Sequence, residues 1–413
     1  MLCACVRGGK VSLNIRDPIH GFIQLNDLEV RLIQTFPFQR LRFIHQLGTT
    51  SWVYPTGVHT RFDHSLGVLQ LASRVIERLS LLNLKINDED ESVFRIAALL
   101  HDIGHAPFSH VGEDMGLFER GLDHEKIGER IIKETEIGEI ISKAIGNDGI
   151  ERVVFIITGT GKPHSSLDNL FHTLLAGQAG IDRMDYLLRD SHFLGVMYGK
   201  FDLERILETI RYDEESDLYW EEGGIHALEQ FLLARYFMFT EVYYHKSRRI
   251  LDYHLSMLVK EYLKVKELEH LPTEVEEYLR LNDYDIISWM LNTENRYRDI
   301  FLNRKFFKKI DIESSDHPTP EEIVLWRWLE KELKRKFNEN DFFFDKANNV
   351  PYKFEKTDIM VMVNGKLTPL HKISRLIESL KPIRKRRVYA SPDKKAEIAK
   401  FVKEFLESEE VSV

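Results

Sequence analysis

Helical periodicity across most of the chain is the feature that most limits its possible folds. Between residues 38 and 292, apolar residues recur at spacings of three and four, the period of an amphipathic α-helix. Consecutive helices of this kind bury their apolar faces against one another, as in a helical bundle. The pattern therefore predicts a mainly α fold, with helices at about 38–46, 62–80, 90–103, 123–144, 171–189, 202–210, 226–265 and 274–292.

Both ends of the chain have a different pattern. Residues 15–25 predict a β-hairpin, which is followed by a helix near 27–35. After residue 340 the sequence predicts, in order, a hairpin around Asn364-Gly365, a strand at 387–390 and an amphipathic helix at 394–406. We therefore divide the chain into a helical core with an extension, residues 1–340, and a small α+β C-terminal lobe, residues 341–413.

Charge and cysteine content narrow the class of protein. The 413 residues carry a formal net charge of −9, so general affinity for nucleic acid is not expected, and an anionic ligand would need local clusters of Arg and Lys. Only two cysteines occur, Cys3 and Cys5, so we expect no disulfide framework and a cytoplasmic location. No apolar run is long enough to cross a bilayer, and no membrane association is expected.

Two histidine-rich runs point to a metal site. His101-Asp102-Ile103-Gly104-His105 ends an apolar run, and a second cluster ends at His64. Buried ionisable groups are costly unless they are paired or bind a metal. The simplest interpretation is that a divalent cation is held by His64, His101, Asp102 and a later carboxylate. Asp182 is the best candidate for that carboxylate. The alternative is that these histidines only make hydrogen bonds at helix ends.

The expected ligand set limits the choice of metal. Two imidazoles and two carboxylates form a mixed nitrogen and oxygen site, which suits one transition ion such as Mn, Fe, Ni, Co or Zn. Mg²⁺ prefers a purer oxygen shell and is expected, if anywhere, on the phosphates of a substrate. The set leaves coordination positions open for water and phosphate oxygens.

Seven short motifs occur in an order that resembles one enzyme family. The sequence is similar to the HD-domain deoxynucleoside triphosphate (dNTP) triphosphohydrolases, the dGTPase-like group, over residues 14–255 and more faintly beyond. The motifs are Asp17-Pro-Ile-His20-Gly21, Phe38-Gln-Arg-Leu-Arg42, Gln46-Leu-Gly48, Arg61-Phe-Asp-His64-Ser-Leu-Gly67, His101 to His110, His124-Glu125 and Asp182 to Asp190. The resemblance implies an HD-domain helical bundle and a phosphohydrolase.

The resemblance also implies a reaction and its catalytic residues. Water would attack the α-phosphorus of a dNTP and release deoxynucleoside and intact triphosphate. His64, His101, Asp102 and Asp182 would be the metal ligands. His105, His110 and His124 would line the phosphates. We expect His110, oriented by Glu113, to be the general acid, because histidine is the side chain best suited to give a proton near neutral pH. His124 would stabilise phosphate or act as an alternate acid.

Further residues are candidates for binding the substrate. The cations available for the phosphates are Arg61, Arg183, Arg189, Arg235 and Lys246. Arg189 has an alternative partner in Asp185, one helical turn away. By resemblance, Tyr186 would lie beneath the deoxyribose and exclude a 2′-hydroxyl, while Gln46, Leu47 and Asp190 would lie near the 3′-hydroxyl. Tyr243 would stack on the base, or would simply belong to the core.

Regulation and assembly stay open. Gln34 stands where activated family members carry an acid that reads guanine, which puts guanine-nucleotide activation in doubt but leaves another nucleotide effector open. The basic run from Lys381 to Arg387 is either a charged strand edge or a contact with an effector phosphate or nucleic acid. The resemblance favours a homodimer or homotetramer. The alternatives to a dNTPase are an HD phosphohydrolase for another nucleotide, such as a monophosphate or signalling nucleotide, and a non-catalytic nucleotide sensor.

Overall fold

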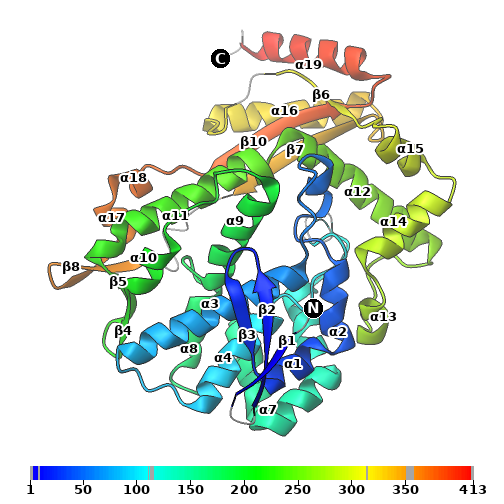
Figure 1. Cartoon of the computed structure of the whole chain (residues 1–413). Coiled ribbons are helices and arrows are strands. Elements are labelled where there is room, and N and C mark those ends of the chain that lie inside the picture. The colour runs from blue at the N-terminus through cyan, green and yellow to red at the C-terminus, as the bar shows by residue number, and fades with distance from the viewer. Residues whose placement is uncertain are drawn as a thin grey trace.

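The chain folds as a mainly α protein with three small sheets in its described part. A computed structural model describes residues 3–7, 10–109, 111, 116–312, 315–349 and 358–410. The helices of the body are α1 (Asp27–Ile33), α2 (Phe36–Arg40), η1 (Leu41–Phe43), η2 (Gly48–Trp52), α3 (Arg61–Leu81), α4 (Asp88–Leu100), α6 (His124–Glu134), α7 (Glu136–Thr158), α8 (Asp168–Ala176), α9 (Ile181–Leu194), α10 (Leu203–Glu208), η3 (Glu222–Gly224), α11 (Ile225–Phe237), the π-helical turn η4 (Met238–Tyr243), α12 (Lys246–Val265), α13 (Val275–Leu279), α14 (Asp283–Asn292) and α15 (Arg296–Leu302). The later helices are α16 (Pro320–Lys336), α17 (Leu370–Ile373), α18 (Arg375–Glu378) and α19 (Lys395–Glu410) (Figure 1).

The body is a bundle of helices around one apolar core. Helices α3, α4, α7, α8 and α9 pack on one another and bury apolar residues that are far apart in the sequence. Phe94 of α4, for example, stacks on Phe171 of α8 with ring centroids 4.5 Å apart. The predicted mainly α fold is thus confirmed. In the part of the chain that is described, no helix is both long and apolar enough to cross a membrane.

Several predicted helices are interrupted, and the breaks matter for the site. The predicted helix at 123–144 divides at Thr135, whose side chain caps α7. The one predicted at 171–189 divides into α8 and α9, because the chain leaves the helical path at Gly177 and re-enters it after Gly180. The one predicted at 226–265 divides into α11, η4 and α12. Hydrophobic periodicity misses these breaks because the apolar pattern continues through them.

Three sheets flank the bundle. One is antiparallel, with the order β1 (Cys3–Arg7), β2 (Lys10–Asp17), β3 (Gly21–Leu25). A second has the order β4 (Ile210–Asp213), β5 (Asp217–Glu221), β8 (Met360–Val363), β9 (Lys366–Pro369), with β5 parallel to β8. A third is antiparallel, with the order β6 (Lys308–Lys309), β10 (Ile383–Ala390), β7 (Phe342–Asn349). The two predicted hairpins, the predicted strand and the predicted final helix are all present.

A second apolar cluster marks the C-terminal lobe. It joins α16, β7, β10 and α19 through buried residues such as Leu329, Leu333, Val388 and Val402. Figure 1 shows α16 and α19 on the side of this sheet that faces away from α12. The packing does not divide at residue 340: Ile310 and α16 belong to the second cluster, while the β8–β9 hairpin pairs with β5 of the body.

Candidate functional site

Four side chains from three helices meet at one point. His64 lies in the first turn of α3, His101 and Asp102 follow the last turn of α4, and Asp182 lies in the first turn of α9. The Nε2 atom of His64 is 3.2 Å from Nε2 of His101, 3.0 Å from Asp182 Oδ1 and 3.7 Å from Asp102 Oδ2. His101 Nε2 is 3.4 Å from Asp102 Oδ1. His64, His101 and Asp102 offer ligand atoms close enough to hold one metal ion.

Both imidazoles present the same ring nitrogen to this point. His64 uses Nδ1 to contact Asp185 Oδ2 at 2.7 Å, and His101 uses Nδ1 to contact the Ala98 carbonyl at 2.9 Å. A hydrogen bond on Nδ1 places the proton there and leaves the Nε2 lone pair for a metal. The site is therefore organised for coordination through Nε2 of both histidines.

The charges at this point also fit a cation. Burial lowers the pKa of His64, but the hydrogen bonds to Asp182 and Asp185 outweigh it and raise the pKa to about 10. Burial raises the pKa of Asp182, but contacts with His101 and His64 hold it well below its usual range. Asp182 and Asp185 strongly favour a positive charge between them. Without a metal ion, a proton on His64 supplies that charge. The donor set thus fits a divalent cation.

A buried network behind His64 fixes its orientation. Asp185 is fully buried and accepts hydrogen bonds from three side chains: His64, His20 at 2.6 Å, and Arg189 at 2.8 and 2.9 Å. Arg189 also donates to Asp17 Oδ2 at 2.7 Å. Because Arg189 is 0% exposed and directed into this network, it does not face the cleft. The prediction that Arg189 binds substrate is therefore wrong, and its alternative pairing with Asp185 is what the structure has.

One glycine allows this network to form. A Cβ atom on Gly67 of α3 would lie 1.9 Å from Asp185 Oδ1 and 2.3 Å from Arg189 Nη2. No side chain fits in that space, so α3 and α9 can approach only because residue 67 is glycine. This close approach brings His64 and Asp182 together.

Arg61 supports the site from the other side. It is 2% exposed, its Nη1 group pairs with Asp102 Oδ2, and its Nε donates to Ser109 Oγ at 2.8 Å. Burial raises the pKa of Asp102, but Arg61, His101 and His105 together hold that pKa well below its usual range. Among the residues that the structure describes, Arg61 Nη2 has no hydrogen-bond partner, so one donor remains for a ligand.

Two histidines stack beside the metal point. The rings of His105 and His124 are 4.1 Å apart and 15° from parallel, and His105 Nε2 is 3.2 Å from Asp102 Oδ1. Burial and the charges of Arg61 and His124 hold the pKa of His105 well below its usual range, so this ring is neutral near pH 7. Gly104 permits the arrangement, because a Cβ there would lie 2.0 Å from the His124 carbonyl oxygen. His110 and Glu113 lie outside the described residues.

Two connected cavities form a cleft at this centre. The inner cavity, about 160 Å³, is lined by Arg61, His101, Asp102, His105, His124, Glu125 and Asp182, among others. The outer cavity, about 440 Å³, is lined by Leu47, Asp190, Tyr243, Arg248, Arg249 and Asn348, among others. Gln46 and Tyr186 line both cavities, so the cleft runs from the ligand cluster to an aromatic pocket. Gln46 Oε1 is buried without a hydrogen-bond partner in the part of the chain described.

Aromatic side chains shape the outer cavity. Tyr186 and Tyr243 meet edge to face with ring centroids 6.4 Å apart. The Tyr243 hydroxyl donates to Asp190 Oδ2 at 2.6 Å, and His59 contacts Asp190 Oδ1 at 2.8 Å. Burial and the charge of Asp190 raise the pKa of Tyr243 well above its usual range, so the hydroxyl stays protonated. Asp190 thus holds the Tyr243 ring in place.

The remaining predicted cations differ in position. Arg183 follows Asp182 in the sequence. Its side chain donates to the carbonyls of Ala176 and Gly177 at the end of α8. Arg235 is 8% exposed and donates to Gln178 Oε1 at 3.1 Å, and burial lowers its pKa. Lys246 is exposed and lines neither cavity, so the prediction that it contacts the substrate is not supported. Arg248 and Arg249 occupy the outer cavity instead.

Sequence reasoning missed two groups of residues. His20 and Asp185 had a usable signal, because both lie inside motifs that carried the resemblance. Asn348 had none, since it comes from β7, about a hundred residues from the other residues of the outer cavity.

Comparisons with known proteins agree with this geometry. Residues 61–153 match the family model described as HD domain, and residues 201–412 match the model described as HD associated region. The chain is 32% identical over 398 residues to Uncharacterized protein MJ1154 of Methanocaldococcus jannaschii, which covers 93% of this chain and 80% of that protein. It is 28% identical over 396 residues to Deoxynucleoside triphosphate triphosphohydrolase SAMHD1 of Bos taurus, which covers 81% and 66%.

Solved structures share the whole fold. A hypothetical protein from Aquifex aeolicus superposes with a TM-score of 0.81 at 36% identity, over 94% of this chain and 99% of that one. A phosphohydrolase from Bacteroides thetaiotaomicron superposes with a TM-score of 0.74 at 26% identity, over 92% of this chain and 100% of that one.

Proposed function

The chain belongs to the HD-domain phosphohydrolase family, and from this premise we propose that it hydrolyses dNTPs at the α-phosphorus, releasing deoxynucleoside and intact triphosphate. Homology to the SAMHD1 triphosphohydrolases supports this choice of substrate. So does the order of the seven motifs along the chain.

The observation that carries the proposal is the shared wall of the two cavities. Phosphates would occupy the inner cavity beside the ligand cluster, and the base would occupy the outer cavity beside Tyr243. Gln46 and Tyr186 stand at the junction, where the sugar of a nucleotide would lie. A monophosphate would leave much of this cleft unused.

Each residue then has a proposed task. A divalent cation held by His64, His101, Asp102 and Asp182 would lower the pKa of a water molecule and offset the charge on the α-phosphate. Arg61 would keep Asp102 in its ligating position and donate Nη2 to a phosphate oxygen. Arg183 and Arg235 line neither cavity, so their binding of the outer phosphates stays a prediction from the sequence.

Proton transfer to the leaving 5′-oxygen needs an acid. We assign it to His110, with Glu113 as the group that orients it, and we assign phosphate stabilisation to His124. His105, neutral and stacked on His124, would support that ring and contact the phosphates without giving up a proton.

Other features of the proposal stay predictions. The His-His-Asp group could hold a divalent metal, as in other HD domains, and we propose Mn, Fe, Ni, Co or Zn. A homo-oligomer, a nucleotide effector and a cytoplasmic location stay predictions from the sequence.

Product identity tests the proposal. Purified protein with Mn²⁺ and each dNTP should release tripolyphosphate and deoxynucleoside in equal amounts. Release of only inorganic phosphate or pyrophosphate would rule out the assigned bond cleavage, and hydrolysis of a monophosphate alone would favour the alternative substrate class.

Asp185→Asn is expected to weaken metal binding by about 10–100-fold, the usual effect of changing a partner of a metal-ligating histidine. The amide would remove a charge that orients His64 and pairs with Arg189. Metal affinity can be measured by competition with a chromogenic chelator. Asp148→Asn, on an exposed surface of α7, should leave affinity unchanged. Equal affinity in Asp185→Asn and the parent would contradict the network's role.

Tyr186→Ala is expected to reduce the preference for dNTPs over ribonucleotides by roughly 10- to 100-fold, because removing the ring opens space for a 2′-hydroxyl. The measurement is kcat/KM for dGTP and GTP, and for dATP and ATP, in both proteins. An unchanged ratio would refute the sugar-gate role of Tyr186.

A further inference from the structure

The segment from Thr240 to Arg249 presents Tyr243 to the outer cavity. Here the expected continuous helix is interrupted by η4, and α12 begins anew with His245 as its N-cap. A helix interrupted in this way leaves backbone carbonyls without their usual partners. Three carbonyls in this segment accept hydrogen bonds from a distant part of the chain.

The donors are side chains of β10. Arg387 Nη2 donates to the Tyr244 carbonyl at 2.8 Å, and the Tyr389 hydroxyl donates to the Lys246 carbonyl at 2.8 Å. Lys385 Nζ donates to the Thr240 carbonyl at 3.2 Å. The interruption is thus held by tertiary contacts in addition to the local His245 cap.

An ion-pair cluster ties the same segment to β7. Asp345 is fully buried and lies directly opposite Arg387 across the two strands. Its Oδ2 accepts from Arg387 at 3.2 Å, and its Oδ1 accepts from Arg249 at 2.9 and 2.7 Å. One carboxylate therefore joins the sheet to the first turn of α12.

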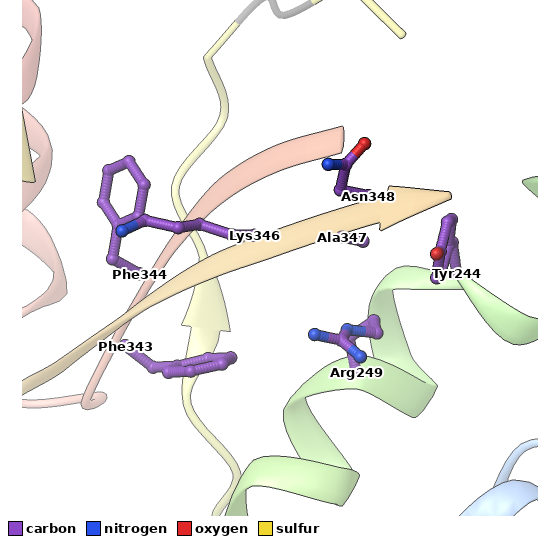
Figure 2. A pocket seen from close by; sticks show the side chains of 7 residues that line it. All are labelled: Tyr244, Arg249, Phe343, Phe344, Lys346, Ala347 and Asn348. Carbon is purple, nitrogen blue, oxygen red and sulfur yellow. The ribbon is translucent and has the colours of Figure 1, made fainter. Parts of the chain in front are cut away.

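A cavity next to the cleft is lined by both parts. This third cavity, about 330 Å³, is lined by Tyr244, Arg249 and residues of β7, namely Phe343, Phe344, Lys346, Ala347 and Asn348 (Figure 2). It shares Tyr244, Arg249 and Asn348 with the outer cavity. The C-terminal sheet therefore supplies a wall of the pocket in addition to its hydrogen bonds.

We infer that the β7–β10 sheet positions the base-binding wall of the substrate pocket, with Arg387 as the main positioning residue. The inference rests on the proposed function in so far as it takes the ligand of the outer cavity to be a nucleoside. Arg387 acts through Tyr244 and Asp345, which set where Tyr243 stands.

This inference gives the basic run from Lys381 to Arg387 a role that neither sequence interpretation foresaw. Along the run itself, β10 pairs with β7 on one side, while β6 reaches only Tyr389 and Ala390. Arg387 is 9% exposed. Both Arg387 and Lys385 donate hydrogen bonds to other groups of the protein. These two cations are therefore not offered to an effector phosphate or to nucleic acid.

Arg387→Met tests the inference on the full-length protein, with Arg384→Met on the same strand as the matched control. We expect the inhibition constant of deoxynucleoside product to rise about tenfold, as expected for loss of hydrogen bonds from a charged group. The inhibition constant of tripolyphosphate should stay within about twofold of its value in the unmodified protein. The inner cavity, where the phosphates would bind, is not lined by Arg387 or by the residues that it contacts. Equal changes in both constants, or none in either, would overturn the inference.

Hydrogen exchange gives a readout that needs no catalysis. In Arg387→Met, backbone amides of residues 240–249 should exchange faster while those of α16 and α19 keep their protection. Tyr389→Phe, which removes one hydroxyl, should give the same pattern more weakly and guards against a folding failure. Faster exchange spread over the whole lobe would contradict the inference. If the parent protein hydrolyses no dNTP, the proposed function fails, while the exchange result still decides whether the sheet holds this segment.

Discussion

Asp182→Ala is expected to leave the protein without bound metal and without measurable dNTP hydrolysis. The substitution removes the carboxylate that lies 3.0 Å from Nε2 of His64 and 3.7 Å from Nε2 of His101. The remaining ligands then carry one negative charge fewer, and a site with fewer anionic ligands binds a divalent ion more weakly. Elemental analysis of protein purified without chelator measures the loss.

The matched control is Asp148→Ala, which removes an exposed carboxylate from α7 and should keep the metal content of the parent. The thermal midpoint without added metal should be similar in both variants, which shows that the fold is intact. Full metal content in Asp182→Ala would show that Asp182 is not a ligand.

His110→Ala is expected to keep the metal and reduce kcat by about 10²–10⁴-fold, the usual cost of removing a general acid. His124→Ala should reduce kcat less if its task is phosphate stabilisation. Adding a substrate analogue with a better leaving group should restore much of the activity of His110→Ala, because such a group needs no proton. Metal loss equal to that of Asp182→Ala would contradict the assignment of His110 as acid.

The convergence of the candidate metal ligands was predictable because each lies in a short motif at a helix terminus. His101 and Asp102 follow an apolar run that must be buried, and His64 begins another helix, so their convergence needed little tertiary information. Asp182 lies beside these residues as expected, although the helix break before it was not predicted. The glycines at 177 and 180 were the signal for that break, and they place Asp182 in a first helical turn.

Tertiary contacts explain what the sequence could not give. His20 and Asp185 are 165 residues apart and meet only because α9 packs against the N-terminal hairpin. The break at Tyr244 is held by Arg387, 143 residues away, while the apolar period continues through it. Arg189 was misassigned because a buried arginine with two carboxylate partners has the same sequence signature as a phosphate-binding arginine.

Metal titration of chelator-treated protein tests the central claim most directly. Adding Mn²⁺ in small steps should raise the rate of tripolyphosphate release from dNTP in proportion to the metal bound, with a plateau at one ion per chain. Tripolyphosphate release that does not depend on the metal, or metal binding that brings no dNTP hydrolysis, would contradict the account.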